Sequence, residues 1–81
     1  MPKYEFHWPE STSTHITENG ITEEDVEQVI KNPDFKGFSR SSGRPLAGGY
    51  IEDGRFIICI YEIDEAEDNL IIPITAYEHE V

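Results

Sequence analysis

The stretch "LAGGYIEDGRFIICIYEI", residues 46–63, decides the fold. Its second half is rich in β-branched and aromatic residues, which are typical of a strand. The Asp53-Gly54 pair between its two apolar runs is typical of the tight turn that joins antiparallel strands. The stretch therefore predicts a β-hairpin in the middle of the chain.

Side chains along a strand point alternately to its two faces, so residues 55–62 divide into two sets. One set is expected to pack beneath the helices: Phe56, Ile58, Ile60 and Glu62. The other set is expected on the opposite, uncovered face: Arg55, Ile57, Cys59 and Tyr61. This assignment decides which polar groups are free to act on a ligand.

Working outward from the hairpin, the pattern predicts a strand on each side of it, at residues 35–41 and 69–78. Pro73 cannot donate a backbone hydrogen bond, so we expect the last strand to lie at an edge or to carry a bulge there. Towards the N-terminus, the alternation of Tyr4, Phe6 and Trp8 predicts a further strand.

Two helices are predicted between that strand and residue 35. Residues 11–20 combine hydroxyl residues with Gly20, a residue that readily ends a helix. The second helix is expected to begin after Thr22, which can cap it, and to end at Asn32-Pro33. The order β-α-α-β-β-β-β predicts a single α+β domain over residues 1–81, with both helices on one face of an antiparallel sheet.

The charge is unevenly distributed along this acidic chain, whose net charge is -11. Residues 36–55 hold four basic and two acidic residues, a local net charge of +2, which leaves -13 for the rest. Because an acidic surface repels phosphate backbones, we expect RNA to bind only weakly and only near this basic segment.

Cysteine content and hydropathy indicate the compartment. The one cysteine, Cys59, lies in an apolar run and cannot form an internal disulfide, which favours a reducing environment. No signal peptide or membrane span is recognisable, so we expect a cytoplasmic protein that does not enter a membrane. The three histidines have no spacing that specifies a metal, and we expect neither a metal nor another cofactor.

Arginine and tyrosine on an uncovered sheet face could cleave RNA without a metal. Guanidinium groups hold the phosphate, and a phenol moves a proton. Arg55 and Tyr61 would lie roughly 20 Å apart along one strand, so Arg44 would have to join them from the neighbouring strand. The structural alternative is that Arg55 flanks the hairpin turn and Tyr61 packs at the sheet margin.

Three pieces of the sequence, in their order and spacing, resemble the BrnT-like branch of the RelE toxin superfamily. They are "W…HITENGITEEDVEQVI…NP", "SGRPLAGG…DGRFIICIYE" and "IIPITAYE". The resemblance implies a toxin of a type II toxin-antitoxin pair, which cleaves RNA without a metal and is silenced by an antitoxin protein. It places Arg44, Arg55 and Tyr61 in the catalytic site, with Tyr77 as a second candidate for moving the proton.

Departures from the pattern of that family all remove positive charge. Ser11 and the Glu18-Asn19 pair stand where many such toxins have basic residues, and Tyr77 replaces an arginine. Fewer phosphate contacts weaken RNA binding. The sequence therefore supports two alternatives: a toxin-like ribonuclease with a weakened site, and a non-catalytic protein-binding module on the same scaffold. The oligomeric state is not predicted.

Overall fold

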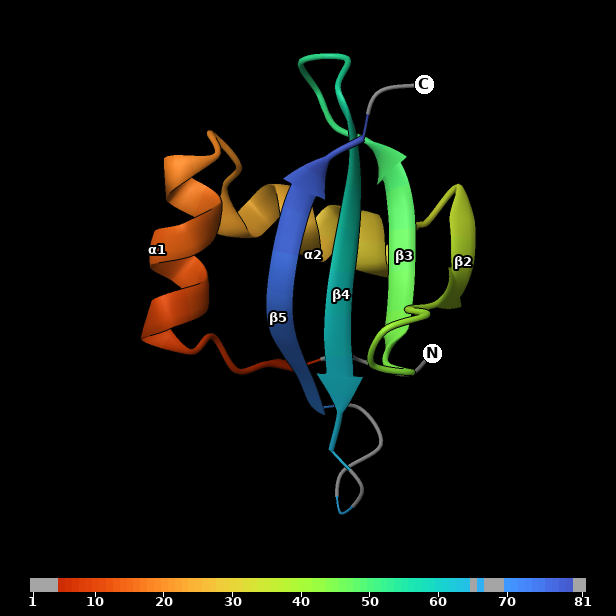
Figure 1. Ribbon diagram of the computed structural model, residues 1–81. Helices are drawn as coiled ribbons and strands as arrows, with labels where there is room; N and C mark the ends of the chain where they lie inside the picture. Colours follow the sequence, from red (N-terminus) through yellow and green to blue (C-terminus); the bar gives the residue numbers. More distant parts are fainter. Residues whose placement is uncertain (1–4, 65, 67–69, 80–81) are drawn as a thin grey trace.

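The computed structural model describes residues 5–64, 66 and 70–79, which form two helices and five strands (Figure 1). The elements follow the order β1-α1-α2-β2-β3-β4-β5, so the α+β class and the order of elements are confirmed. Their bounds are β1 Glu5–Phe6, α1 Glu10–Glu18, α2 Glu23–Lys31, β2 Phe35–Phe38, β3 Pro45–Tyr50, β4 Phe56–Ile63 and β5 Leu70–Glu78. Tyr4, the first of the three alternating aromatic residues, lies outside the described residues, and β1 ends before Trp8, the last of them.

The five strands form one sheet in the order β1-β5-β4-β3-β2. The four strands from β2 to β5 form an antiparallel meander, as predicted. The short β1 pairs with β5 in parallel, however, so the sheet is mixed and the prediction of an antiparallel sheet was wrong at this edge. The direction of β1 depends on its pairing with β5, which is far from it in the sequence, so no local sequence pattern predicts this direction.

Pro73 lies at a bulge in β5, which is one of the two predicted alternatives. Tyr61 of β4 is paired with Pro73 and Ile60 with Thr75, so Ile74 is the extra residue. A bulge leaves one residue outside the regular ladder. Here the hydroxyl of Thr12 in α1 donates to the Ile74 carbonyl at 3.2 Å, which ties α1 to β5.

The two helices differ in how their ends are formed. α1 follows Pro9 without a side-chain cap, and Gly20 after it takes the left-handed conformation with a φ of 74°. α2 begins with a capping box, in which the Thr22 hydroxyl accepts from the Asp25 amide and the Asp25 carboxylate accepts from the Thr22 amide. The predicted cap at Thr22 and end at Asn32 are confirmed.

α2 crosses one face of the sheet behind β4 and β3, and α1 lies alongside β5 (Figure 1). A row of three small, fully buried residues, Ala47, Cys59 and Ala76, crosses β3, β4 and β5 on the covered face. Their size lets the helices approach closely. The two helices add Ile16, Val26, Val29 and Ile30 to the same core.

The faces predicted for β4 are therefore reversed. Ile57, Cys59 and Tyr61 belong to the core beneath the helices, whereas their neighbours Phe56, Ile58 and Ile60 lie on the opposite face. The prediction was wrong because both sets of β4 are apolar, so alternation separates them without showing which one the helices cover. The row of small residues was the signal that could have decided it.

Candidate functional site

Tyr61, a predicted catalytic residue, lies in the core. Its side chain is only 5% exposed and packs in the cluster that includes Ile57 and Cys59. Across the sheet it is paired with the buried Pro73. A phenol in this position cannot meet a phosphate on the open face, so the expectation that it shares that face with two arginines was wrong.

Arg55 also lies on the helix side, where it joins three segments. Its guanidinium donates to the Gly20 carbonyl at 2.7 Å and to the Asn19 carbonyl at 3.4 Å, just beyond α1. The same group pairs with Asp53 at 2.7 Å and lies 3.7 Å from a carboxylate oxygen of Glu78. A cation at the C-terminal end of a helix is favoured by the helix dipole, so these contacts define a structural role.

Asp53 is held in its charged form by the same residue. The backbone amide of Arg55 donates to the Asp53 carboxylate at 3.1 Å, and this bond is the main cause that lowers the pKa of Asp53. The Arg55 guanidinium adds a second bond and a favourable charge. Both contacts stabilise the β3–β4 turn.

Arg44 and Tyr77 do lie on the open face, but at different ends of it. Arg44 donates to Glu62 at 2.7 Å, in a half-exposed ion pair at one end of β4. Tyr77 is paired with Ile58, four residues away from Glu62 along β4, or about 13 Å. The structure therefore does not bring the four predicted site residues together on one surface.

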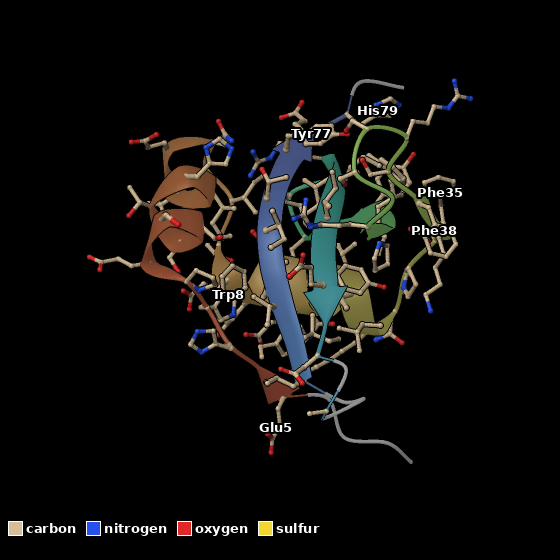
Figure 2. The ribbon with its side chains drawn as sticks, turned by 60° about the horizontal axis from the view of Figure 1, so that its bottom comes forward. Glu5, Trp8, Phe35, Phe38, Tyr77 and His79 are labelled. Atoms are coloured by element: carbon tan, nitrogen blue, oxygen red, sulfur yellow. The ribbon has the colours of Figure 1, made fainter. Side chains whose placement is uncertain are left out.

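The open face instead carries a groove lined by aromatic and aliphatic side chains. It has a volume of about 470 Å³ and is lined by Phe35, Leu46, Tyr50, Phe56, Ile58, Tyr77 and His79. Figure 2 shows Phe35 and Phe38 on β2 and Tyr77 and His79 near the end of β5. Large apolar rings stay accessible here, since Tyr50 is 61%, Phe35 51% and Tyr77 42% exposed.

Gly48 determines how the rings of this groove lie. A side chain at Gly48 would put its Cβ 2.9 Å from both the Phe56 ring and the Ile58 side chain, so the ring occupies that space. Phe56 then meets the Tyr50 ring edge-to-face, with centroids 5.0 Å apart, and the His79 ring at 6.1 Å. Such contacts hold aromatic rings in fixed orientations.

Tyr50 also borders a second, acidic hollow. This hollow has a volume of about 300 Å³ and is lined by Glu24, Asp25, Gln28, Tyr50, Ile51 and Glu52. The Asp25 carboxylate is engaged in the capping box of α2, whereas Glu24 and Glu52 are exposed. Tyr50 therefore borders both an apolar groove and a group of carboxylates.

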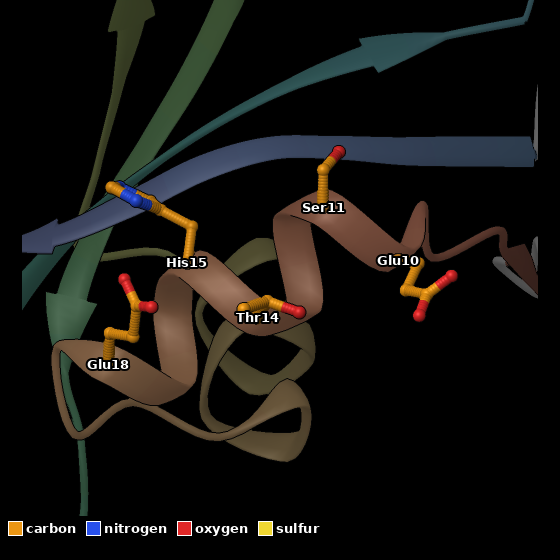
Figure 3. Close-up of a pocket in the computed structure, with 5 residues that line it drawn as sticks. All are labelled: Glu10, Ser11, Thr14, His15 and Glu18. Atoms are coloured by element: carbon orange, nitrogen blue, oxygen red, sulfur yellow. The ribbon is translucent and has the colours of Figure 1, made fainter.

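A third hollow follows the outer side of α1 and is lined by Glu10, Ser11, Thr14, His15 and Glu18 (Figure 3). All five lining residues come from α1, and no other described residue lines the hollow. Within the described ranges, no three His, Cys, Asp or Glu side chains are grouped to hold a metal ion. No helix in the same part of the chain is long and apolar enough to cross a membrane.

Cys59 is unsuited to act as a nucleophile. Burial, followed by the charge of Asp25, raises the pKa of the Cys59 thiol to about 12. Since the thiolate is the reactive form, the thiol stays protonated and inert at neutral pH.

Comparison with known proteins yields no match: no family model fits the chain, and no curated protein or solved structure is significantly similar to it. The candidate site is therefore defined by its geometry alone. Sequence reasoning missed Phe35, Tyr50 and Phe56 as site residues because it assigned the side of β4 that carries Phe56 to the core. The signal that was available is that both sides of β4 are apolar while only two short helices are present to cover them.

Proposed function

We propose that the protein is a non-catalytic protein-binding module, and that the aromatic groove on the open face is its binding surface. The observation that carries the proposal is the exposure of Phe35, Tyr50 and Tyr77 around one apolar groove. Aromatic side chains are enriched where proteins bind one another, and large exposed apolar patches are uncommon on monomers. A protein partner is also what the resemblance to antitoxin-bound toxins implies.

The positions of the cationic groups favour this proposal over RNA cleavage. The Arg55 guanidinium is engaged by backbone carbonyls and by Asp53, and Arg44 is paired with Glu62. Tyr61, the phenol predicted to move the proton, lies in the core. Phosphate binding would require these ion pairs to break on a protein with a net charge of -11, which opposes association with RNA.

Site-specific photo-cross-linking in the native host tests the proposal. A photoreactive phenylalanine analogue is placed at Tyr50 or at Phe35, both exposed in the groove, and at His15 on α1 as the control position. We expect one and the same protein to be cross-linked from both groove positions and not from His15. That partner is then purified, and its affinity is measured for the wild type and for Tyr77→Ser.

The affinity of the purified partner is expected to fall by about tenfold or more in Tyr77→Ser, because an aromatic anchor is replaced by a small polar residue. Phe38→Ser is the matched control, since Phe38 is 74% exposed but does not line the groove. Equal loss in both variants, or cross-linking from His15 alone, would contradict the proposal. RNA cleavage by the purified wild type at low salt without divalent metal would replace it with the enzymatic alternative.

A further inference from the structure

We infer that the groove receives a basic segment of its partner, in which an apolar side chain enters the aromatic groove and an arginine lies over Tyr50. The arginine would point towards Glu24 and Glu52 in the acidic hollow. This inference rests on the proposed function and adds the chemistry of the partner to it. Its basis is the position of Tyr50 between the two hollows.

Tyr50 lines both hollows, which are thereby neighbours at this residue. On the groove side the Phe56 ring meets Tyr50 at an interplanar angle of 76°. Tyr50 is 61% exposed, so its ring stays accessible to a ligand. A guanidinium placed on a tyrosine ring is attracted by the π-system, and nearby carboxylates can accept its hydrogen bonds.

The charge around Tyr50 selects a cationic ligand. Glu24 and Glu52 are exposed carboxylates at the hollow, and the described residues show no ion pair for either of them. Among the described residues, no lysine or arginine lines either hollow, and the one histidine, His79, lies in the groove and not in the acidic hollow. Charges beyond about 8 Å are largely screened at physiological salt, so these neighbouring carboxylates determine the local preference.

A second copy of this chain fits the surface less well than a basic partner. Two copies would each bring a net charge of -11, and the same carboxylates would face each other across a symmetric interface. Like charges placed together at an interface oppose binding and exclude wrong partners. The surface is therefore complementary to an apolar and basic segment of a different protein.

Two capped tripeptides test the inference directly. Their sequences are acetyl-Leu-Gly-Arg-amide and acetyl-Leu-Gly-citrulline-amide, so the first and third side chains point the same way in an extended chain. Citrulline keeps the shape of arginine without its charge. Binding is followed by NMR titration of the 81-residue protein, using the ring signals of Tyr50, Phe56 and Tyr77, with choline as a small-cation probe.

We expect the arginine peptide to bind about fivefold more tightly than the citrulline peptide. In the Glu24→Gln/Glu52→Gln double variant this preference should fall below about twofold, while binding of the citrulline peptide stays unchanged. Glu18→Gln removes an acidic residue from the hollow on α1 and is expected to leave the preference intact. Raising the salt concentration should weaken the binding of the arginine peptide and leave the binding of the citrulline peptide unchanged.

Equal affinity for the two peptides, or a preference that survives the double variant, would overturn the inference. Choline binding as tight as that of the arginine peptide would overturn it as well, because a small cation would then suffice. These outcomes leave the proposed function standing if photo-cross-linking identifies a partner at the groove. Failure of the cross-linking experiment, in contrast, removes both proposals.

Discussion

The two faces of the sheet are both apolar, but they are built from side chains of different size. On the covered face, the small residues Ala47, Cys59 and Ala76 form a row across three strands, and the helices pack closely over it. On the open face, Phe56 and Tyr50 pack against each other beside Gly48. The comparison shows that β4 supplies a core to one side and a binding surface to the other.

The largest expected difference between the faces is in how much the free energy of unfolding falls when a side chain is removed. Ile57→Ala should lower the free energy of unfolding by about 2–5 kcal/mol, because Ile57 is fully buried and the change leaves a cavity. Tyr77→Ala on the open face should cost less than about 1 kcal/mol, since 42% of Tyr77 already contacts solvent. Urea denaturation followed by Trp8 fluorescence measures both. Similar costs would show that the open face is part of the core.

Two adjacent glycines, Gly48 and Gly49, provide a sharper test because they face opposite sides. A Cβ at Gly48 would lie 2.9 Å from the Phe56 ring, so Gly48→Ala should destabilise the protein by about 1–3 kcal/mol through overpacking. A Cβ at Gly49 would lie 3.5 Å from Val29, an ordinary contact, so Gly49→Ala should change stability by less than about 0.5 kcal/mol. Thermal unfolding of the two variants distinguishes them. The reverse order would mean that the open face is loosely packed.

The buried thiol of Cys59 gives the covered face a dependence on pH. Its folded-state pKa is raised to about 12, above the value of about 8.5 in an unfolded chain. The stability it contributes is therefore fully present below about pH 8.5 and is lost as the pH rises towards 12. Between pH 9 and 10 the wild type should lose about 1.2 kcal/mol more than Cys59→Ala. Parallel pH profiles of the two proteins would contradict this prediction.

The smallest expected difference is between the two arginines that were predicted to act together. Arg55→Ala should cost about 1 kcal/mol, because its guanidinium is bonded to the Gly20 carbonyl and to Asp53. Arg44→Ala should cost less than about 0.5 kcal/mol, since its ion pair with Glu62 is half exposed. Chemical denaturation of both variants measures the difference. An equal effect would show that Arg55 does not hold the loop after α1.

Local signals in the sequence predicted most of the fold. The Asp53-Gly54 turn, the cap at Thr22 and the end of α2 at Asn32 each depend on a few neighbouring residues, and the structure confirms them. The bulge at Pro73 follows from one missing backbone donor. These features could be predicted because their causes lie within a few residues in the chain.

The candidate site was less accessible to sequence reasoning. Tyr77 was named among its residues and does line the groove, but it was expected to move a proton beside arginines that lie elsewhere. Tyr50 meets Phe56, and Phe35 lines the same groove, only because β2, β3 and β4 are adjacent in the sheet. The groove therefore depends on strand register, which the sequence alone did not specify.

By itself, the sequence determined the order of the elements, the β3–β4 turn, the cap of α2 and the strong negative charge, because each depends on residue types or on near neighbours. Only the tertiary structure decided which side of β4 the helices cover, that β1 runs parallel to β5, and that Tyr50 joins an aromatic groove to an acidic hollow. The physical reason is that both sides of β4 are apolar, so the alternation of side chains does not show which side the helices cover. Contacts between distant segments then select which side is buried.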